Sequence, residues 1–112
     1  MTRIKALGDE FDVIREASRS LPSEELKVAF LEAVAELEDN EAHRTHAFPK
    51  TRFHRIRGIK QEIYRADVTK TSGWRIHAQY SKAGTIELRD LVPGDEHDQV
   101  VQVVKAKKHR YE

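Results

Sequence analysis

Between residues 62 and 80, apolar and polar side chains alternate along two segments that are separated by the turn Ser72-Gly73. This alternation predicts two strands that bury one face and leave the other face polar. The polar positions include Arg65, Arg75 and His77. A guanidinium binds phosphate through paired hydrogen bonds, and an imidazole moves a proton near neutral pH. The pattern therefore predicts a surface that can hold and cleave a phosphodiester.

A third strand, over residues 85–92, adds Arg89 to this surface. Its alternation predicts that Ile86 and Leu88 point to one face, and that Glu87, Arg89 and Leu91 point to the other. Neighbouring strands lie about 4.8 Å apart, so the basic side chains can converge on one patch. Metal-free RNA cleavage needs a base, an acid and charge stabilisation for attack by the 2′-hydroxyl. The alternative is a polar face that water or a salt-bridged helix covers.

A run of basic residues precedes these strands, and it can follow a nucleic-acid backbone. The alternative is a solvated loop and strand edge. Phe48 and Phe53, in the same region, either stack on bases or pack in the core. The run consists of Lys50, Arg52, His54, Arg55, Arg57 and Lys60.

Two further motifs contain histidines that could carry chemistry. His97 stands among carboxylates in the turn Gly94–Asp98, where its pKa can be tuned for proton transfer; the alternative is a charged turn that caps a helix. His43 and His46 have a spacing that suits a metal, but no cysteine or carboxylate pair accompanies them. We therefore expect no metal and no other cofactor.

The remaining periodicity predicts an α+β fold in which an N-terminal helical hairpin packs on a small antiparallel sheet. We expect a short strand at 3–7, helices at 9–20 and 23–39, a loop from Asn40 to His54, and strands at 62–69, 74–80 and 85–92. Ser23 is the expected cap of the second helix. A last helix begins at Asp95 or Asp98 and ends at Lys108, and the valine cluster at 100–104 leaves a fourth strand as the alternative.

Length and composition limit the classes of protein that need to be considered. The 112 residues predict a single domain spanning residues 1–112, with a modest core. Acidic residues concentrate in positions 1–41, whereas positions 42–82 are basic and contain only Glu62 and Asp67 as acidic residues. This basic middle segment suits a polyanionic partner. With no cysteine, no long apolar run and no secretory signal at the N-terminus, we expect a cytoplasmic protein and no membrane partner.

Three sequence motifs resemble the RelE/ParE superfamily of bacterial toxins. They are R-I-R-G (Arg55–Gly58), I-Y-R-A-D-V (Ile63–Val68) and S-G-W-R-I-H-A-Q-Y (Ser72–Tyr80). That family shows an R-L-x-G turn, a strand with a tyrosine and a basic residue, and a G-Y-R-L-x-Y strand in the same order. The resemblance covers nearly the whole length through its order of a short strand, a helical hairpin and antiparallel strands.

The resemblance implies a toxin that cleaves mRNA, usually on the ribosome, and that a cognate antitoxin neutralises. It implies RNA contacts for Arg65 and Arg75, and an acid or base role for His97 like that of a histidine in the YafQ-like branch. We therefore expect His97, His77, Arg75 and Arg89 to be catalytic. Arg65, Lys60, Arg57, Arg55 and Arg52 are expected to bind the substrate.

The chain also departs from this family. Asp67 stands where some ribonuclease members carry a second basic residue, the turn after Gly94 is acidic, and Gln102 lies near the place of a tyrosine. These departures favour the alternative of a non-catalytic binder of the same fold. Such a protein inhibits gyrase, as ParE-like members do, or binds another protein or a nucleic acid.

Overall fold

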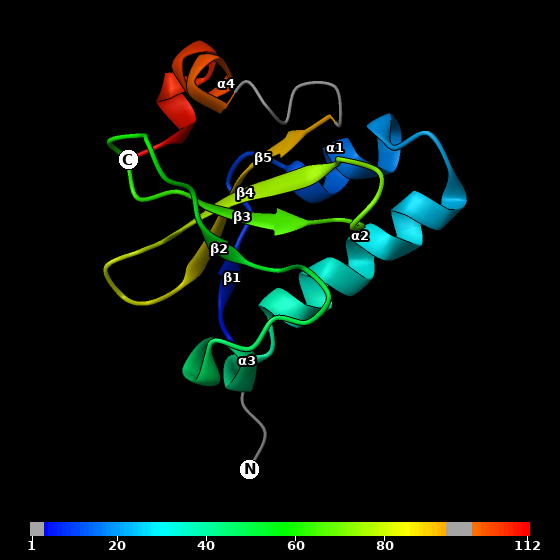
Figure 1. The fold of residues 1–112 in the computed structure, drawn as a ribbon, viewed down its shortest axis with the longest axis horizontal. Helices are drawn as coiled ribbons and strands as arrows, with labels where there is room; N and C mark the ends of the chain where they lie inside the picture. Colours follow the sequence, from blue (N-terminus) through cyan, green and yellow to red (C-terminus); the bar gives the residue numbers. More distant parts are fainter. Residues whose placement is uncertain (1–3, 94–99) are drawn as a thin grey trace.

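The fold was analysed in a computed structural model, which describes residues 4–93 and 100–112. Figure 1 shows helices on one side of a sheet, with a C-terminal helix apart from them. In chain order the elements are β1 (Leu7–Gly8), α1 (Val13–Ser20), α2 (Glu24–Leu37), α3 (Asn40–Thr45), β2 (His54–Arg55), β3 (Tyr64–Asp67), β4 (Arg75–Tyr80), β5 (Ile86–Val92), α4 (Val100–Ala106) and the 3₁₀ turn η2 (Lys108–Arg110).

The N-terminal helical hairpin is confirmed, and a carboxylate or hydroxyl before each helix accepts from its first N–H groups. The Asp9 carboxylate accepts hydrogen bonds from the backbone N–H groups of Val13 and Ile14, at 2.7 and 3.0 Å, and the helix expected at 9–20 begins only at Val13. The Ser23 hydroxyl accepts from the N–H of Leu26 at 3.1 Å and caps α2, as expected. These bonds satisfy N–H groups that the first helical turn leaves free.

The expectation of a loop from Asn40 to His54 is wrong at both of its ends. The segment begins with α3, which the Asp39 carboxylate caps by accepting from the N–H of Glu41 at 3.0 Å. His46 ends this helix in the left-handed conformation, with φ of 57°. The segment ends with the short edge strand β2. A helix of six residues and a strand of two are too short to produce a readable period.

The strands form one five-stranded sheet in the order β1-β5-β4-β3-β2. Strands β3, β4 and β5 make the expected antiparallel meander, β2 extends it, and β1 pairs parallel with β5. The turns of the meander contain Gly73 and Gly84, whose φ values of 82° and 83° favour glycine. The α+β class predicted from the sequence is therefore confirmed.

A β-bulge in β5 changes which side chains share a face. Ala78 pairs with Leu88, but the preceding His77 pairs with Asp90, so Arg89 is an extra residue. Beyond the bulge the alternation is shifted, and Leu91 pairs with Ile76 and belongs to the main core. The expectation that Leu91 shares the face of Arg89 is therefore wrong, because alternation alone does not reveal an inserted residue.

The two faces of the sheet are covered by different parts of the chain. Helices α1 and α2 cover one face, where the main core contains the large buried side chains of Phe30, Leu37, Ile76 and Leu88. The other face carries a smaller cluster of Ile56, Ile63, Val104 and Tyr111. The C-terminal segment is the expected helix, so the alternative of a fourth strand there is wrong. Within the described residues, no helix is long and apolar enough to cross a membrane.

Candidate functional site

The polar face of the sheet is covered by the C-terminal segment. The side chains predicted to form an open patch are buried: Arg75 is 7%, His77 1% and Arg89 4% exposed. The expectation of a solvent-facing patch at these three residues is therefore wrong. The alternative, a polar face beneath a salt-bridged helix, describes what is found. We call these buried charges and their partners the inner charge cluster, and its members are Asp67, Arg52, Arg65, Arg75, Arg89, Asp90, Lys107 and Arg110.

Asp67 is the centre of one half of the inner charge cluster. This carboxylate is fully buried, and three arginines surround it. Arg52 contacts it with Nε at 2.6 Å and Nη2 at 2.5 Å, and the Nε atoms of Arg75 and Arg65 lie 2.8 and 3.8 Å away. Three of the predicted phosphate-binding arginines therefore share one internal counter-ion.

Arg89 and Asp90 make the other half of the cluster, and the β-bulge turns both toward the polar face. The Nε of Arg89 donates to Gln79 Oε1 at 2.9 Å, and its terminal nitrogens lie 3.9 Å from Glu10 and 3.6 Å from Glu112. Asp90 Oδ1 lies 3.0 Å from the Nζ of Lys107 and 3.2 Å from Nη1 of Arg110. These contacts hold the C-terminal segment on the sheet.

His77 forms a buried pair with Tyr111 in the same region. Its Nδ1 lies 2.8 Å from the tyrosine hydroxyl. Burial, and then the positive charges of Arg65 and Lys107, lower the pKa of His77 from 6.5 to about 4. Burial and the Asp90 carboxylate raise the pKa of Tyr111 above its ordinary value. Both groups are therefore uncharged at neutral pH.

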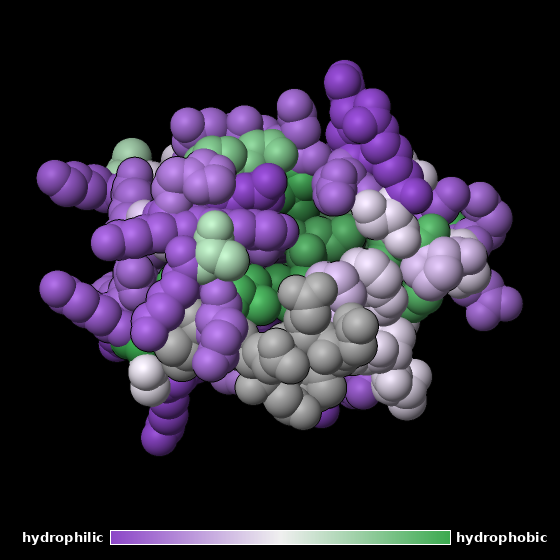
Figure 2. Space-filling model, turned by 90° about the horizontal axis from the view of Figure 1, so that it is seen from above, coloured by the Kyte–Doolittle hydropathy of each residue, from purple (hydrophilic) through white to green (hydrophobic). Residues whose placement is uncertain are grey.

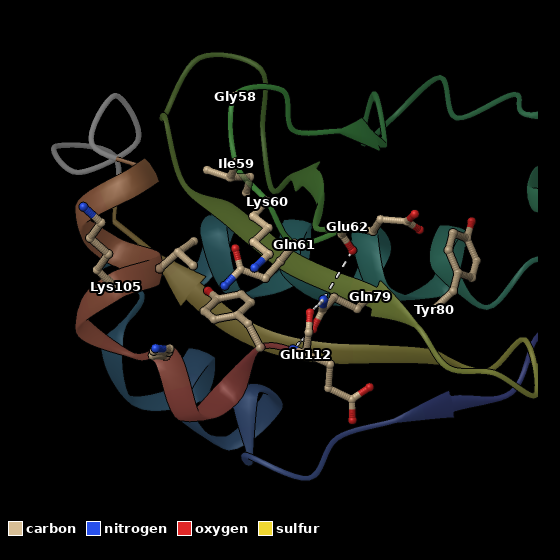
Figure 3. A pocket seen from close by; sticks show the side chains of 12 residues that line it. Gly58, Ile59, Lys60, Gln61, Glu62, Gln79, Tyr80, Lys105 and Glu112 are labelled. Carbon is tan, nitrogen blue, oxygen red and sulfur yellow. Dashed lines mark hydrogen bonds between the residues drawn. The ribbon is translucent and has the colours of Figure 1, made fainter.

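A groove of about 920 Å³ lies between the loop at residues 58–62 and the C-terminal segment. Figure 3 shows these two walls with Gln79 of β4 between them. The Nε2 of Gln79 donates to the carbonyl of Glu62 at 3.3 Å and to that of Glu112 at 3.0 Å, so one side chain ties the floor to both walls (Figure 3). Tyr111, whose hydroxyl contacts the buried His77, also lines the groove.

The lysines of the groove differ from the buried cations because none has a carboxylate partner in the part of the chain that the structure describes. Lys60 comes from the first wall, and Lys105 and Lys108 come from α4 and η2 on the second. All three are exposed, and none forms an ion pair with any described residue. Figure 2 shows long hydrophilic side chains gathered at the end of the molecule where α4 lies in Figure 1. The groove therefore presents lysine ammonium groups from both walls, and the exposed carboxylates of Glu62 and Glu112 also line it.

The structure separates the predicted site residues into three groups. Lys60 lines the groove, and the exposed Arg55 and Arg57 line the adjoining hollow at residues 54–59. Arg52, Arg65, Arg75, Arg89 and His77 lie in or beside the inner charge cluster. His97, together with its turn, lies outside the described residues.

The His43 and His46 motif does not present two free imidazoles. His43 Nδ1 lies 2.6 Å from the hydroxyl of Tyr80, and its Nε2 lies 2.6 Å from the carbonyl of Leu37, so both of its ring nitrogens are engaged. Among residues 4–93 and 100–112, no group of three or more His, Asp or Glu side chains is placed to hold a metal ion.

Sequence reasoning missed Lys105, Lys108 and Tyr111, which the fold brings beside Lys60. The only available signal was the basic tail K-A-K-K-H-R-Y-E, which the sequence pattern assigns to a helix end and not to a site. Nothing in that tail indicates which part of the sheet it packs on. The chain has no significant match among protein-family models, curated proteins or solved structures.

Proposed function

We propose that this protein is the toxin of a bacterial toxin–antitoxin pair and acts on RNA as a metal-independent endoribonuclease that inhibits translation. The observation that carries the proposal is the groove, whose two walls present Lys60, Lys105 and Lys108 with no carboxylate partner among the described residues. The order of short strand, helical hairpin and antiparallel meander is consistent with the RelE/ParE resemblance of the sequence motifs.

RNA suits the groove better than a single small anion does. Cations stand on two facing walls, so they can contact successive phosphates of one strand. Each contact releases counterions from the RNA, so affinity must depend steeply on salt concentration. The adjoining hollow, with Arg55 and Arg57, extends the basic surface beyond the first wall. A strand of RNA can therefore follow cations from the hollow into the groove, where it passes the carboxylates of Glu62 and Glu112.

Tyr111 and His77 form a titratable pair beside the groove. The pKa of Tyr111 is raised by burial, so its hydroxyl keeps its proton, and the neutral imidazole of His77 lies within hydrogen-bond reach of it. The low pKa of His77 makes it a weak base. The pair alone is therefore an incomplete acid–base set. We propose that cleavage takes place on mRNA in the ribosome, where further groups surround the scissile phosphate.

The experiment is inducible expression in a bacterium, with growth curves and primer extension on a reporter mRNA. The wild type is expected to stop growth and to produce new RNA 5′ ends. A Lys60→Gln, Lys105→Gln double variant should lose most of this activity. A matched Lys70→Gln, Lys82→Gln variant, altered at exposed lysines of the meander turns, should keep it. Growth arrest that co-expression of a neighbouring small gene relieves would support the antitoxin partner.

A second function, binding without catalysis, is favoured by the inner charge cluster. Arg75 is held against the buried Asp67, and Arg89 lies near the exposed carboxylates of Glu10 and Glu112; both arginines are themselves buried. Intact mRNA combined with DNA damage on induction would favour gyrase as the target. Intact mRNA with no effect on growth would leave a binding module and contradict the ribonuclease proposal.

A further inference from the structure

A second hollow, which we call the aromatic pocket, is separated from the groove by the edge strand β2. Its volume is about 400 Å³, within the range of small-ligand sites. Five ring side chains from α3, the following segment, β3 and β4 line it: His43, Phe48, Phe53, Tyr64 and Tyr80. Phe48, Tyr64 and Tyr80 are only partly buried. The pocket therefore offers aromatic surface to a ligand in addition to completing the core.

The rings of the aromatic pocket hold one another in fixed orientations. Phe53 and Tyr64 stack with their centroids 5.1 Å apart and 16° between their planes. Tyr80 stands edge-on to Tyr64, with centroids 5.1 Å apart and planes at 83°. These are the geometries that aromatic pairs prefer. A flat ligand would therefore meet a preformed wall and would not need to order it.

His43 fixes the position of Tyr80 in this wall. The Leu37 carbonyl can only accept a hydrogen bond, so Nε2 of His43 is protonated and donates to it. Nδ1 is then the acceptor for the hydroxyl of Tyr80, 2.6 Å away. Burial lowers the pKa of His43 and raises that of Tyr80 to about 12, so both groups stay neutral and this chain of bonds persists at pH 7.

Every residue of the aromatic pocket that can carry a charge at neutral or mildly acidic pH is basic. Besides His43 they are Lys5, His46, His54 and Arg55, and no aspartate or glutamate lines the hollow. The ammonium of Lys5 lies 5.5 Å from the centre of the Tyr80 ring. A ligand that suits this pocket therefore combines a flat aromatic group with negative charge, and an aromatic side chain of a neutral or basic peptide lacks the second feature.

The aromatic pocket is connected to the groove by shared residues. His54 and Arg55 line both the pocket and the adjoining hollow, and Gly58 and Ile59 line both that hollow and the groove. Figure 3 shows Tyr80 at the end of the row of lining side chains away from Lys105. One polymer can therefore contact the groove lysines and reach the pocket around the edge strand.

From this arrangement, we propose that the aromatic pocket binds an unstacked base of a single-stranded RNA, with the adjacent phosphate on Arg55 and Lys5. Stacking on aromatic rings tolerates every base, so the pocket adds affinity without requiring one sequence. This inference rests on the proposed function, because RNA is the molecule that would supply the base. The pocket itself is tested separately from the groove.

The first test is NMR titration of the labelled full-length chain with AMP and UMP, and with ribose 5-phosphate as the matched ligand without a base. The nucleotides are expected to shift the ring signals of Phe48 and Tyr64 and to show contacts from base protons to those rings. Ribose 5-phosphate should bind at least about tenfold more weakly, since it has no base to stack. Equal binding of all three ligands, or no shift of the ring signals, would overturn the pocket.

Two variants and one control locate the site. Arg55→Gln, at an exposed residue, should weaken nucleotide binding about three- to tenfold without altering the fold. Phe48→Leu keeps most of the apolar volume and removes a ring, so it should reduce the base contacts. Arg19→Gln, at an exposed arginine of α1, should change neither. Shifts produced by N-acetyltryptophanamide, with none from nucleotides, would assign the pocket to a protein partner and contradict the inference.

The second test uses an RNA oligonucleotide and the same strand with one abasic position, scanned along its length. One position is expected to lower affinity about tenfold when its base is removed, and Phe48→Leu should abolish that difference. If RNA binding depends on the groove lysines but no abasic position matters, the pocket inference fails and the proposed function stands. If nucleotides bind in the pocket but substitution of the groove lysines does not change RNA affinity, the groove assignment fails and the pocket inference is retained.

Discussion

The inner charge cluster and the groove lie on the same side of the sheet, and both are rich in cations, yet they are built in opposite ways. In the cluster, the buried carboxylates of Asp67 and Asp90 pair with cations that range from the buried Arg75 to the partly exposed Arg52 and Lys107. In the groove, Lys60, Lys105 and Lys108 remain in water with no carboxylate partner within residues 4–93 and 100–112. A buried charge needs a counter-ion to persist, whereas an exposed unpaired charge remains free to bind one. The cluster therefore supports the fold, whereas the groove lysines can take part in the proposed RNA binding.

The largest expected effect comes from removing the counter-ion at the centre of the cluster. Asp67→Asn leaves three guanidinium groups around a neutral amide, which should lower the free energy of unfolding by about 3–5 kcal/mol. Glu25→Gln, at an exposed carboxylate of α2, should change it by less than about 0.5 kcal/mol. Urea unfolding measures both. A loss below about 1 kcal/mol for Asp67→Asn would contradict the structural role of the cluster.

The second prediction concerns pH and follows from the neutral state of His77. Because the folded protein lowers the pKa of His77 from 6.5 to about 4, the unfolded chain binds the proton more tightly. The stability that His77 contributes is present above pH 6.5 and is lost as the pH falls toward 4. The loss should reach about 3 kcal/mol, since one pKa unit corresponds to about 1.4 kcal/mol.

The matched variant for this prediction is His77→Asn, which cannot titrate and keeps an acceptor or donor near the position of Nδ1. The unfolding free energy of the variant should fall less steeply between pH 6.5 and 4 than that of the wild type. Parallel curves would show that His77 is not buried in the neutral form.

A smaller effect is expected at the boundary between the two regions, where Tyr111 contacts His77. Tyr111→Phe removes the hydroxyl but keeps the ring, and the buried imidazole loses a partner at 2.8 Å. The unfolding free energy should fall by about 1–2 kcal/mol. Tyr64→Phe is the control, because no hydrogen bond of its hydroxyl is found among the described residues, and it should change stability by less than about 0.5 kcal/mol.

The smallest effect is predicted for the groove. Lys60→Gln and Lys105→Gln remove exposed charges that have no partner among the described residues, so each should change the unfolding free energy by less than about 0.5 kcal/mol. Thermal unfolding at low salt is a sufficient measurement. A loss of 2 kcal/mol or more would mean that these lysines belong to the fold, and the contrast with the cluster would disappear.

Local patterns were enough to predict the elements with strong periods. The meander follows from alternation around Ser72-Gly73, and the hairpin follows from the helical spacing around Pro22 and the cap at Ser23. The short helix α3 has too few turns to produce a period, although Asp39 is the type of residue that caps a helix. The bulge at Arg89 was missed because the alternation of apolar and polar residues does not reveal an inserted residue.

The site was harder to predict than the fold, because it depends on where the C-terminal segment packs. Alternation places Arg75 and His77 on a polar face but does not reveal whether that face meets water or another part of the chain. Contacts such as Tyr111 to His77 and Arg110 to Asp90 join residues far apart in the sequence. Lys60 was recognised from a local basic run, whereas Lys105 and Lys108 required the tertiary structure.

The most direct test of the central claim is the salt dependence of single-stranded RNA binding, measured by fluorescence anisotropy. It compares the wild type with the Lys60→Gln, Lys105→Gln, Lys108→Gln variant and with a control altered to glutamine at the exposed residues Arg19, Lys70 and Lys82. If the groove binds RNA, the groove variant should bind at least about tenfold more weakly. Its slope of log affinity against log salt, which is negative, should become shallower by about 2, because each phosphate that a lysine no longer neutralises reduces the steepness by about 0.7. The account would be contradicted if the groove variant kept the wild-type slope and affinity while the control variant lost them.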